Sequence, residues 1–334
     1  MIKGILIFLI VLGHNMVFTL PLEKWGIMSY LYLFHIRVFF LLPFLYGARP
    51  LGMTRFGLYF VRFYWPYLLL AVLLAIGYGV SHGFSQWTWQ SWGKLLFICD
   101  ADSLRSMCGL SMLWFLPAMM STLMMRDWYY ASGCVVKSLL LVCSACCSIL
   151  FVFFPHIHEN ICAWVPFGIP TACAFLLPGV IMRWVWGNVP PHSSWACFSL
   201  SLAIYASGSY LYFVGVATHP DRETGLFHIL QLFMPFVCMI LLQKLVECAK
   251  GGMKIVSLLG KESMKLYLIS PFVGYMAFFV CQKSGLVNWW MGIITQLVIV
   301  CVSYFIASKI LIGRLESLLL PRSPENIKSA LHLS

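Results

Sequence analysis

The sequence predicts an all-α integral membrane protein with about ten transmembrane helices and both termini in the cytoplasm. Of its 334 residues, 61% are hydrophobic and only 10% are charged, whereas soluble domains carry about 25% charged residues. A soluble globule of this size could not cover its surface with so few polar side chains, and a disordered chain is far less apolar. The apolar runs are continuous rather than alternating, which predicts helices and argues against a transmembrane β-barrel.

Ten apolar runs are long enough, or nearly so, to cross a bilayer, which needs about 20 helical residues. In chain order they are Ile2–Leu20, Ile27–Tyr46, Phe56–Tyr78, Leu113–Met125, Val135–Phe154, Ile169–Trp186, Trp195–Val216, Leu226–Val246, Met264–Val280 and Trp289–Leu311. No small-residue cleavage site follows the first run, so we expect a retained helix rather than a signal peptide. The fourth run is short, and we expect its helix to begin earlier, near Cys108.

The basic residues predict the orientation, because cytoplasmic loops are enriched in Lys and Arg. With the N-terminus inside, most basic residues fall on the cytoplasmic side, and the outer set is Lys24, Lys94, Arg105, Arg222 and Lys283. We therefore expect one membrane domain over residues 1–312 and a short cytoplasmic tail over residues 313–334. The net charge of +11 then reflects cytoplasmic loops and not a nucleic-acid partner.

The outer loop between the third and fourth runs combines aromatic and acidic residues. Tryptophans such as Trp87 and Trp89 are typical of an interfacial belt. The alternative is that they stack on sugar rings while Asp100 or Asp102 accepts hydrogen bonds from hydroxyl groups.

The 13 cysteines are scattered and predict no zinc site. Three of them, Cys99, Cys108 and Cys162, fall in outer loops, where one disulfide is an option.

Four ionisable residues, which are His14, His35, Arg37 and Arg62, lie inside the predicted spans. Placing such a side chain in the bilayer costs free energy, so its presence is typical of a functional site. His14 lies about 16 Å beyond Lys3 on a helical rise, and His35 lies about 12 Å into the second span. Both histidines should therefore reach the middle of the bilayer on adjacent antiparallel helices. The alternative is a pair of core histidines that bond to backbone carbonyls. Arg37 lies deeper in the second span and needs an anion or a cluster of backbone groups.

The third span brings a further arginine into the bilayer. Arg55, Tyr59 and Arg62 follow one another at i, i+4 and i+7, which places them on one helix face. By this assignment no Asp or Glu lies inside a span, so the missing counter-ion of Arg62 could be an anionic ligand such as a phosphate. The alternative is that its side chain extends toward the lipid headgroups.

Four segments together resemble acyltransferase family 3, the bacterial membrane O-acyltransferases of surface glycans. Lys3-Gly4-Ile5 running to Val11-Leu12-Gly13-His14 resembles the "RGI…VVLGH" opening of that family. The family's "FHMPLFF" is similar to Phe34-His35-Ile36-Arg37-Val38-Phe39-Phe40. Its "LWFLPA" matches Leu113-Trp114-Phe115-Leu116-Pro117-Ala118. Its "LGKNSLxIYLxH" is similar to Leu259-Gly260-Lys261-Glu262-Ser263 with Leu266-Tyr267-Leu268. Their order and spacing make the set specific, and the resemblance covers nearly the whole chain.

The resemblance implies a ten-helix enzyme of the inner (cytoplasmic) membrane that uses no metal. It would move an acyl group, usually acetyl from acetyl-CoA, to a hydroxyl of a cell-surface or lipid-linked glycan. His14 would be the catalytic base or a transiently acylated residue, and His35 would carry a second proton or orient His14. The CoA phosphates would be held by Lys3, Arg55 and Arg62, and the glycan would be contacted by Arg37, Trp87, Trp89, Asp100 and Asp102.

Three positions depart from the family pattern. Lys3 stands where the family usually has Arg, Pro43-Phe44 replaces Ser-Gly, and Ser270 replaces a final His. These departures suit a divergent subfamily with an unusual substrate, or a weakened enzyme.

Other functions compete with acyl transfer. A transporter or flippase of a lipid-linked glycan also uses buried charges and a central cavity, although we find no inverted repeat. A non-catalytic partner of a polysaccharide synthase and a polymerase are further alternatives.

Overall fold

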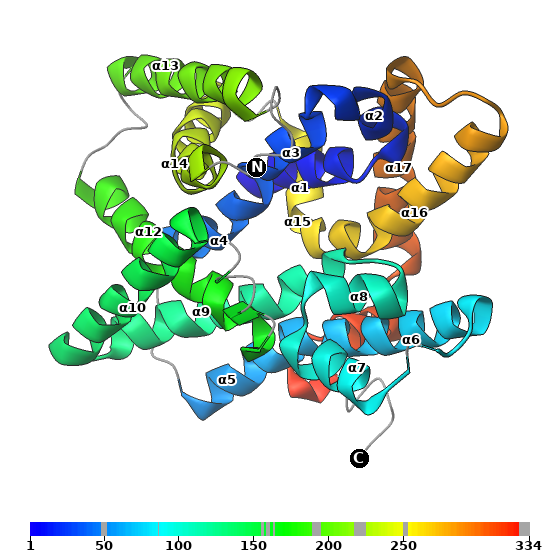
Figure 1. Ribbon diagram of the computed structural model, residues 1–334, viewed down its shortest axis with the longest axis horizontal. Helices are drawn as coiled ribbons and strands as arrows, with labels where there is room; N and C mark the ends of the chain where they lie inside the picture. The colour runs from blue at the N-terminus through cyan, green and yellow to red at the C-terminus, as the bar shows by residue number, and fades with distance from the viewer. Residues whose placement is uncertain are drawn as a thin grey trace. The chain divides into compact units, whose positions relative to one another are not determined.

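The computed structural model describes residues 1–47, 52–85, 87–154, 157, 161–162, 164–188, 195–216, 225–249 and 253–326. All regular elements in these ranges are helical (Figure 1). Among the described residues, eight helical segments are long and apolar enough to cross a membrane, and a ninth candidate is a pair of helices bent by 64°. The chain is therefore an all-α, multi-pass membrane protein.

The chain divides into two compact units, each described here by itself. Unit 1 comprises Met1–Leu41 and Trp184–Ile312, and unit 2 comprises Leu42–Arg183 and Gly313–Ser334. The elements that begin in unit 1 are α1 (Ile2–Gly13), α2 (Met16–Thr19), η1 (Leu20–Trp25), α3 (Ile27–Tyr32), α4 (His35–Leu45), α13 (Trp195–Leu211), η6 (Tyr212–Val216), α14 (Gly225–Cys248), α15 (Lys254–Lys261), α16 (Ser263–Lys283), α17 (Trp289–Phe305) and η7 (Ile306–Ile310). Those that begin in unit 2 are α5 (Met53–Tyr59), η2 (Phe60–Tyr64), α6 (Trp65–His82), α7 (Trp89–Gly93), η3 (Lys94–Ile98), α8 (Ala101–Cys108), η4 (Met112–Trp114), α9 (Phe115–Ala131), α10 (Cys134–Phe153), η5 (Pro166–Gly168), α12 (Ile169–Asn188) and α18 (Gly313–Leu319).

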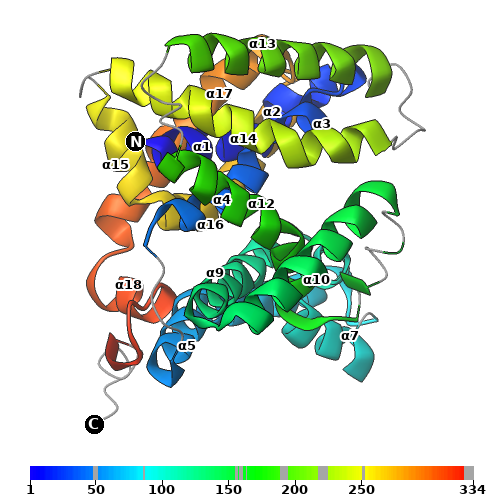
Figure 2. The same cartoon turned by 90° about the vertical axis from the view of Figure 1, so that its left-hand side faces the viewer.

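Unit 1 is built around the N-terminal helices. Helix α1 packs against α15 and α16, and α2 packs against α17. Helix α13 lies along α14 (Figures 1 and 2). The face that α1 turns inward is fully apolar apart from its glycines, with Leu6, Ile7 and Ile10 almost completely buried. The N-terminal helices of unit 1 and its later helices α15, α16 and α17 therefore share one apolar core.

Unit 2 folds the expected outer loop back onto a spanning helix. Helix α8, in the middle of that loop, packs along α6. The Tyr64 hydroxyl donates a hydrogen bond to the Leu96 carbonyl, and the Tyr67 hydroxyl donates one to the Leu95 carbonyl. These bonds anchor η3 on the third predicted span.

Two of the predicted spans differ in detail from the expectation. The first run is divided, because α1 ends at Gly13 and α2 begins at Met16. The fourth does not begin near Cys108, which instead ends the separate helix α8. Helix α9 begins at Phe115 and continues beyond Met125 to Ala131, so that two charged residues lie within it.

Candidate functional site

The break between α1 and α2 is held open by a polar contact with α17. The side-chain amide of Asn15 donates hydrogen bonds to the Gly292 carbonyl at 2.9 Å and to Thr295 Oγ1 at 3.2 Å, and Asn15 is 1% exposed. A Cβ atom on Gly292 would lie 2.5 Å from the Cα of Phe18, so α2 and α17 touch backbone to backbone. Irregular backbone at membrane depth is tolerated where protein groups satisfy it. The break between α1 and α2 is therefore stabilised by specific contacts within unit 1.

His14 caps the end of α1 at this break, and its tautomer follows from its contacts. His14 Nδ1 lies 2.8 Å from the carbonyl oxygen of Ile10, one turn earlier. A carbonyl oxygen only accepts hydrogen bonds, so Nδ1 carries the proton of the neutral ring. His14 Nε2 is then the nitrogen with a free lone pair, and the side chain is half-buried.

His35 repeats this arrangement at the start of α4. Its Nδ1 lies against the Leu31 carbonyl oxygen, its side chain is fully buried, and its Nε2 has no hydrogen-bond partner. A Cβ atom on Gly13 would lie 3.6 Å from that Nε2, so the nitrogen faces the residue before His14. The two histidines therefore lie in the same part of unit 1, and each makes the carbonyl bond of a core histidine.

Tyr32 stands between the two histidines, and sequence reasoning did not single it out. Its hydroxyl lies 3.5 Å from His14 Nε2. Its ring packs edge-on against the ring of His35, with 4.9 Å between the centroids. A tyrosine in an apolar run carries no signal by which its neighbours could have been predicted.

Three of the four family-like segments come together in unit 1. A Cβ atom on Gly4 would overlap the carbonyl oxygen of Val256 in α15, and one on Gly260 would lie 3.1 Å from the Gly4 nitrogen. Helix α16, which carries Ser270, passes beside the break, because a Cβ atom on Gly274 would lie 3.7 Å from the His14 carbonyl oxygen. The "LWFLPA"-like segment lies in unit 2.

Lys3 and Arg37, the other predicted site residues of unit 1, differ in exposure. Lys3 is exposed near the start of α1. Arg37 is half-buried in α4, and its guanidinium donates a hydrogen bond of 3.4 Å to Gln231 Oε1 of α14. Gln231 and the neighbouring His228 are both buried.

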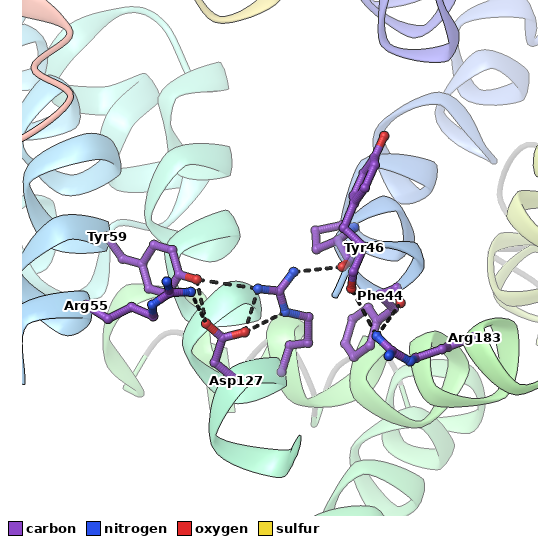
Figure 3. A network of polar contacts seen from close by, with 8 residues as sticks. Phe44, Tyr46, Arg55, Tyr59, Asp127 and Arg183 are labelled. Atoms are coloured by element: carbon purple, nitrogen blue, oxygen red, sulfur yellow. Dashed lines mark hydrogen bonds and ion pairs between the residues drawn. The ribbon is translucent and has the colours of Figure 1, made fainter. Parts of the chain in front are cut away.

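A second polar cluster lies in unit 2 around the carboxylate of Asp127 (Figure 3). The Tyr59 hydroxyl donates to Asp127 Oδ2 at 2.6 Å, and Arg55 lies 3.4 Å from the same oxygen. Arg126 donates to Asp127 Oδ1 through Nε at 2.8 Å and through a terminal nitrogen at 2.5 Å. Asp127 is fully buried and Arg126 is 5% exposed. Asp127 lies just beyond the fourth predicted run, within α9, and it already provides a carboxylate partner for Arg55.

The same cluster caps the C-terminal end of α4. Arg126 donates to the Pro43 carbonyl at 2.7 Å, and Arg183 donates to the Tyr46 carbonyl at 3.0 Å (Figure 3). The last carbonyls of a helix have no partner within it and carry a partial negative charge, which guanidinium groups neutralise. A Cβ atom on Gly179 would collide with the Phe44 ring. Pro43 and Phe44, which depart from the family pattern, therefore both make contacts at this end of α4: Pro43 with Arg126 and Phe44 with Gly179.

Arg62 does not share the surroundings of Arg55 and Tyr59. It lies in the π-helical turn η2, which changes the register of the helix. Its side chain is exposed, whereas Tyr59 is buried, and its guanidinium lies 5.9 Å from the centre of the Phe63 ring. The expectation of one common face is therefore wrong for Arg62, since i, i+7 residues align only on a regular α-helix.

The predicted glycan-binding residues of the outer loop separate into two groups. Asp100 caps the N-terminus of α8, where its carboxylate accepts from the Ser103 nitrogen at 2.7 Å and from the Ser103 hydroxyl at 2.8 Å. Trp87 is partly buried against Phe84. Trp89 is 94% exposed and Asp102 is also exposed. Trp89 and Asp102 are therefore the more exposed of the four side chains.

The three cysteines that the sequence places in outer loops form no disulfide. Cys99 and Cys108 are buried and Cys162 is partly buried, and none of the three is in a disulfide. Burial raises the pKa of the Cys99 and Cys108 thiols to about 12. The disulfide that the sequence left open is therefore not formed.

The candidate residues fall in separate units: His14, His35, Lys3 and Arg37 lie in unit 1, and the remainder lie in unit 2. Within the described ranges, no group of three or more His, Cys, Asp or Glu side chains could hold a metal ion. No known protein family, curated protein or solved structure matches the chain. A functional interpretation therefore depends on the residues themselves.

Proposed function

We propose that the protein is a membrane O-acyltransferase that moves an acyl group, most simply acetyl, from acyl-CoA to a hydroxyl of a cell-surface or lipid-linked glycan. The observation that carries the proposal is His14 at the helix break. Its Nδ1 is bonded to a backbone carbonyl, its Nε2 lies beside the Tyr32 hydroxyl, and a second histidine, His35, faces the preceding residue Gly13. A neutral imidazole fixed in one tautomer is suited to act as a general base near neutral pH.

His14 would take the proton of the acceptor hydroxyl on Nε2 while that oxygen attacks the thioester carbonyl. The Ile10 carbonyl bonded to Nδ1 stabilises the imidazolium that forms, in the way a third group orients a catalytic base. His35 supports the site from the other side of Gly13. Its buried position suits an orienting role better than direct contact with a large glycan.

The cluster in unit 2 supports a phosphate-bearing donor. Arg55, Arg126 and Arg183 carry three positive charges, against one carboxylate on Asp127. Arg55 keeps 22% of its side chain exposed, and a partly exposed guanidinium binds phosphate with two parallel hydrogen bonds. The residues that would hold CoA phosphates are then Arg55 and Arg183, with Arg62 a weaker candidate than the sequence indicated.

The test compares ester-linked acetate on the surface glycan of the source cell, measured by NMR before and after mild alkali. The strains are the wild type, a deletion, and the deletion carrying either wild-type protein, His14→Ala or His82→Ala. His82 is exposed at the end of α6 and serves as the matched control. We expect the deletion and His14→Ala to lack acetate and His82→Ala to retain it. Full acetylation by a normally expressed His14→Ala protein would rule out the mechanism.

A second candidate, transport of a lipid-linked glycan, is favoured by one observation. Broken helices with polar residues at the break are typical of transporter binding sites, and α1 and α2 form such a pair with a 64° bend. The same strains distinguish the two functions. A transporter deletion lowers the amount of surface glycan and leaves the acetate per glycan unchanged, and a non-catalytic partner would tolerate His14→Ala.

A further inference from the structure

Tyr32 places a hydroxyl group beside the reactive nitrogen of His14 and its ring against His35. We propose that Tyr32 is a catalytic residue, which donates the hydrogen bond that stabilises the oxyanion when the acceptor hydroxyl attacks the acyl thioester. The inference rests on the proposed acyl transfer and assigns the donor that this reaction needs.

The hydrogen-bonding roles of the two histidines require a donor from elsewhere. Both rings give their Nδ1 proton to a carbonyl oxygen of the preceding turn, so both present Nε2 as an acceptor. An oxyanion is stabilised by donors that point to the position where its charge develops. Neither neutral histidine can supply one, whereas the phenol of Tyr32 can.

The length of the contact between Tyr32 and His14 agrees with this role. At 3.5 Å it lies at the outer limit of a hydrogen bond, so it is a weak bond that an incoming hydroxyl can replace. Once the acceptor hydroxyl donates to His14 Nε2, the Tyr32 hydroxyl turns its proton from that nitrogen toward the reacting carbonyl oxygen. Tyr32 is half-buried beside the fully buried His35, and a hydrogen bond to a charged oxygen is stronger where water is partly excluded.

The step balances with an acyl thioester as the second reactant. His14 Nε2 accepts the hydroxyl proton as the new C–O bond forms and the carbonyl oxygen becomes negative. Tyr32 donates its hydrogen bond to that oxygen and keeps its own proton. The C–S bond then breaks as the carbonyl re-forms, and the thiolate takes the proton back from His14.

The experiment uses the full-length protein in proteoliposomes, with radiolabelled acetyl-CoA and the surface glycan of the deletion strain as probes. Tyr32→Phe keeps the ring that packs on His35 and removes only the hydroxyl. We expect kcat to fall about 10²- to 10³-fold while KM for both probes stays within about twofold, since only the transition state loses a bond. Tyr32→3-fluorotyrosine, which retains a stronger donor, should keep at least the wild-type kcat.

Tyr30→Phe is the matched control on the same helix. It loses hydrogen bonds to Tyr205 at 2.9 Å and Ser209 at 2.7 Å, away from both histidines, and should leave kcat unchanged. A folded Tyr32→Phe protein with wild-type kcat, or with a raised KM alone, overturns the inference while acyl transfer stands. No transfer by the wild-type protein overturns the proposed function itself.

Discussion

At the scale of single residues, a backbone carbonyl one turn back decides which ring nitrogen of His14 and of His35 is available. His14 and His35 could be predicted from the sequence because a polar residue in an apolar run is conspicuous. Tyr32 could not, because tyrosines are common in such runs and its neighbours come from another helix. Asp127 was missed because it follows the end of the fourth apolar run, although α9 carries it into a buried setting.

Asp127 should be essential for the stability of unit 2. Asp127→Asn removes the charge that faces Arg126 and Arg55, and leaving a buried charge without its partner costs about 3–5 kcal/mol. We expect a clearly lower melting temperature in detergent micelles. Asp102→Asn, at an exposed position of α8, is the control and should change stability by no more than about 0.5 kcal/mol. Equal melting temperatures for the two variants would show that the charge of Asp127 does not stabilise the cluster.

At the scale of helices, the sequence predicts where apolar segments lie but not how they are interrupted or joined. All ten predicted runs contain helices. The break at His14 depends on Asn15 reaching α17, a contact across 277 positions of the chain. No periodicity within the first run indicates such a partner. The π-helical turn at Arg62 escaped prediction for a related reason, since it changes register without interrupting the apolar pattern.

The crossing of α1 and α15 provides a test at this scale. A Cβ atom on Gly4 would overlap a backbone carbonyl, which cannot rotate away, so Gly4→Ala must separate the two helices. Overpacking typically costs about 1–3 kcal/mol, and we expect at least the upper part of that range. Gly57→Ala in α5 meets nothing within 4 Å and is the control. The readout is the yield of monodisperse protein and its melting temperature, and two similar values would contradict the close crossing.

Pro178 leaves a backbone carbonyl of α12 that depends on α10 for its hydrogen bond. A proline lacks the N–H that would bond the carbonyl four residues earlier, here that of Ala174. The Ser148 hydroxyl donates to this carbonyl at 2.8 Å, and Ser144 accepts from the Leu177 nitrogen at 2.7 Å. Ser148→Ala should therefore destabilise unit 2 by about 0.6–2 kcal/mol, the range found for hydrogen bonds between membrane helices. Ser138→Ala, exposed on the same helix, should have no measurable effect on thermal unfolding.

At the scale of the whole molecule, composition alone predicts the membrane environment, because few charges and long apolar runs leave no other stable arrangement. The division into two units could not be predicted in this way. Unit 1 joins the first 41 residues to a segment that begins at Trp184, and its contacts depend on glycines and buried amides that carry no directional signal in sequence. The expected domain of residues 1–312 thus contains an organisation finer than the sequence indicates.

The orientation of the whole chain can be tested by labelling from outside the cell. The distribution of Lys and Arg predicts that the loop bearing α8 is outside and that α15 is in the cytoplasm. Asp102→Cys and Lys254→Cys place a thiol at an exposed site in each segment. A membrane-impermeant maleimide applied to intact cells should label position 102 and spare position 254, with the modified peptides identified by mass spectrometry. Both should react after the membrane is permeabilised. The opposite pattern in intact cells would invert the topology, and it would place the end of unit 2 that carries Arg55 and Arg183 on the side of the membrane where acyl-CoA is absent.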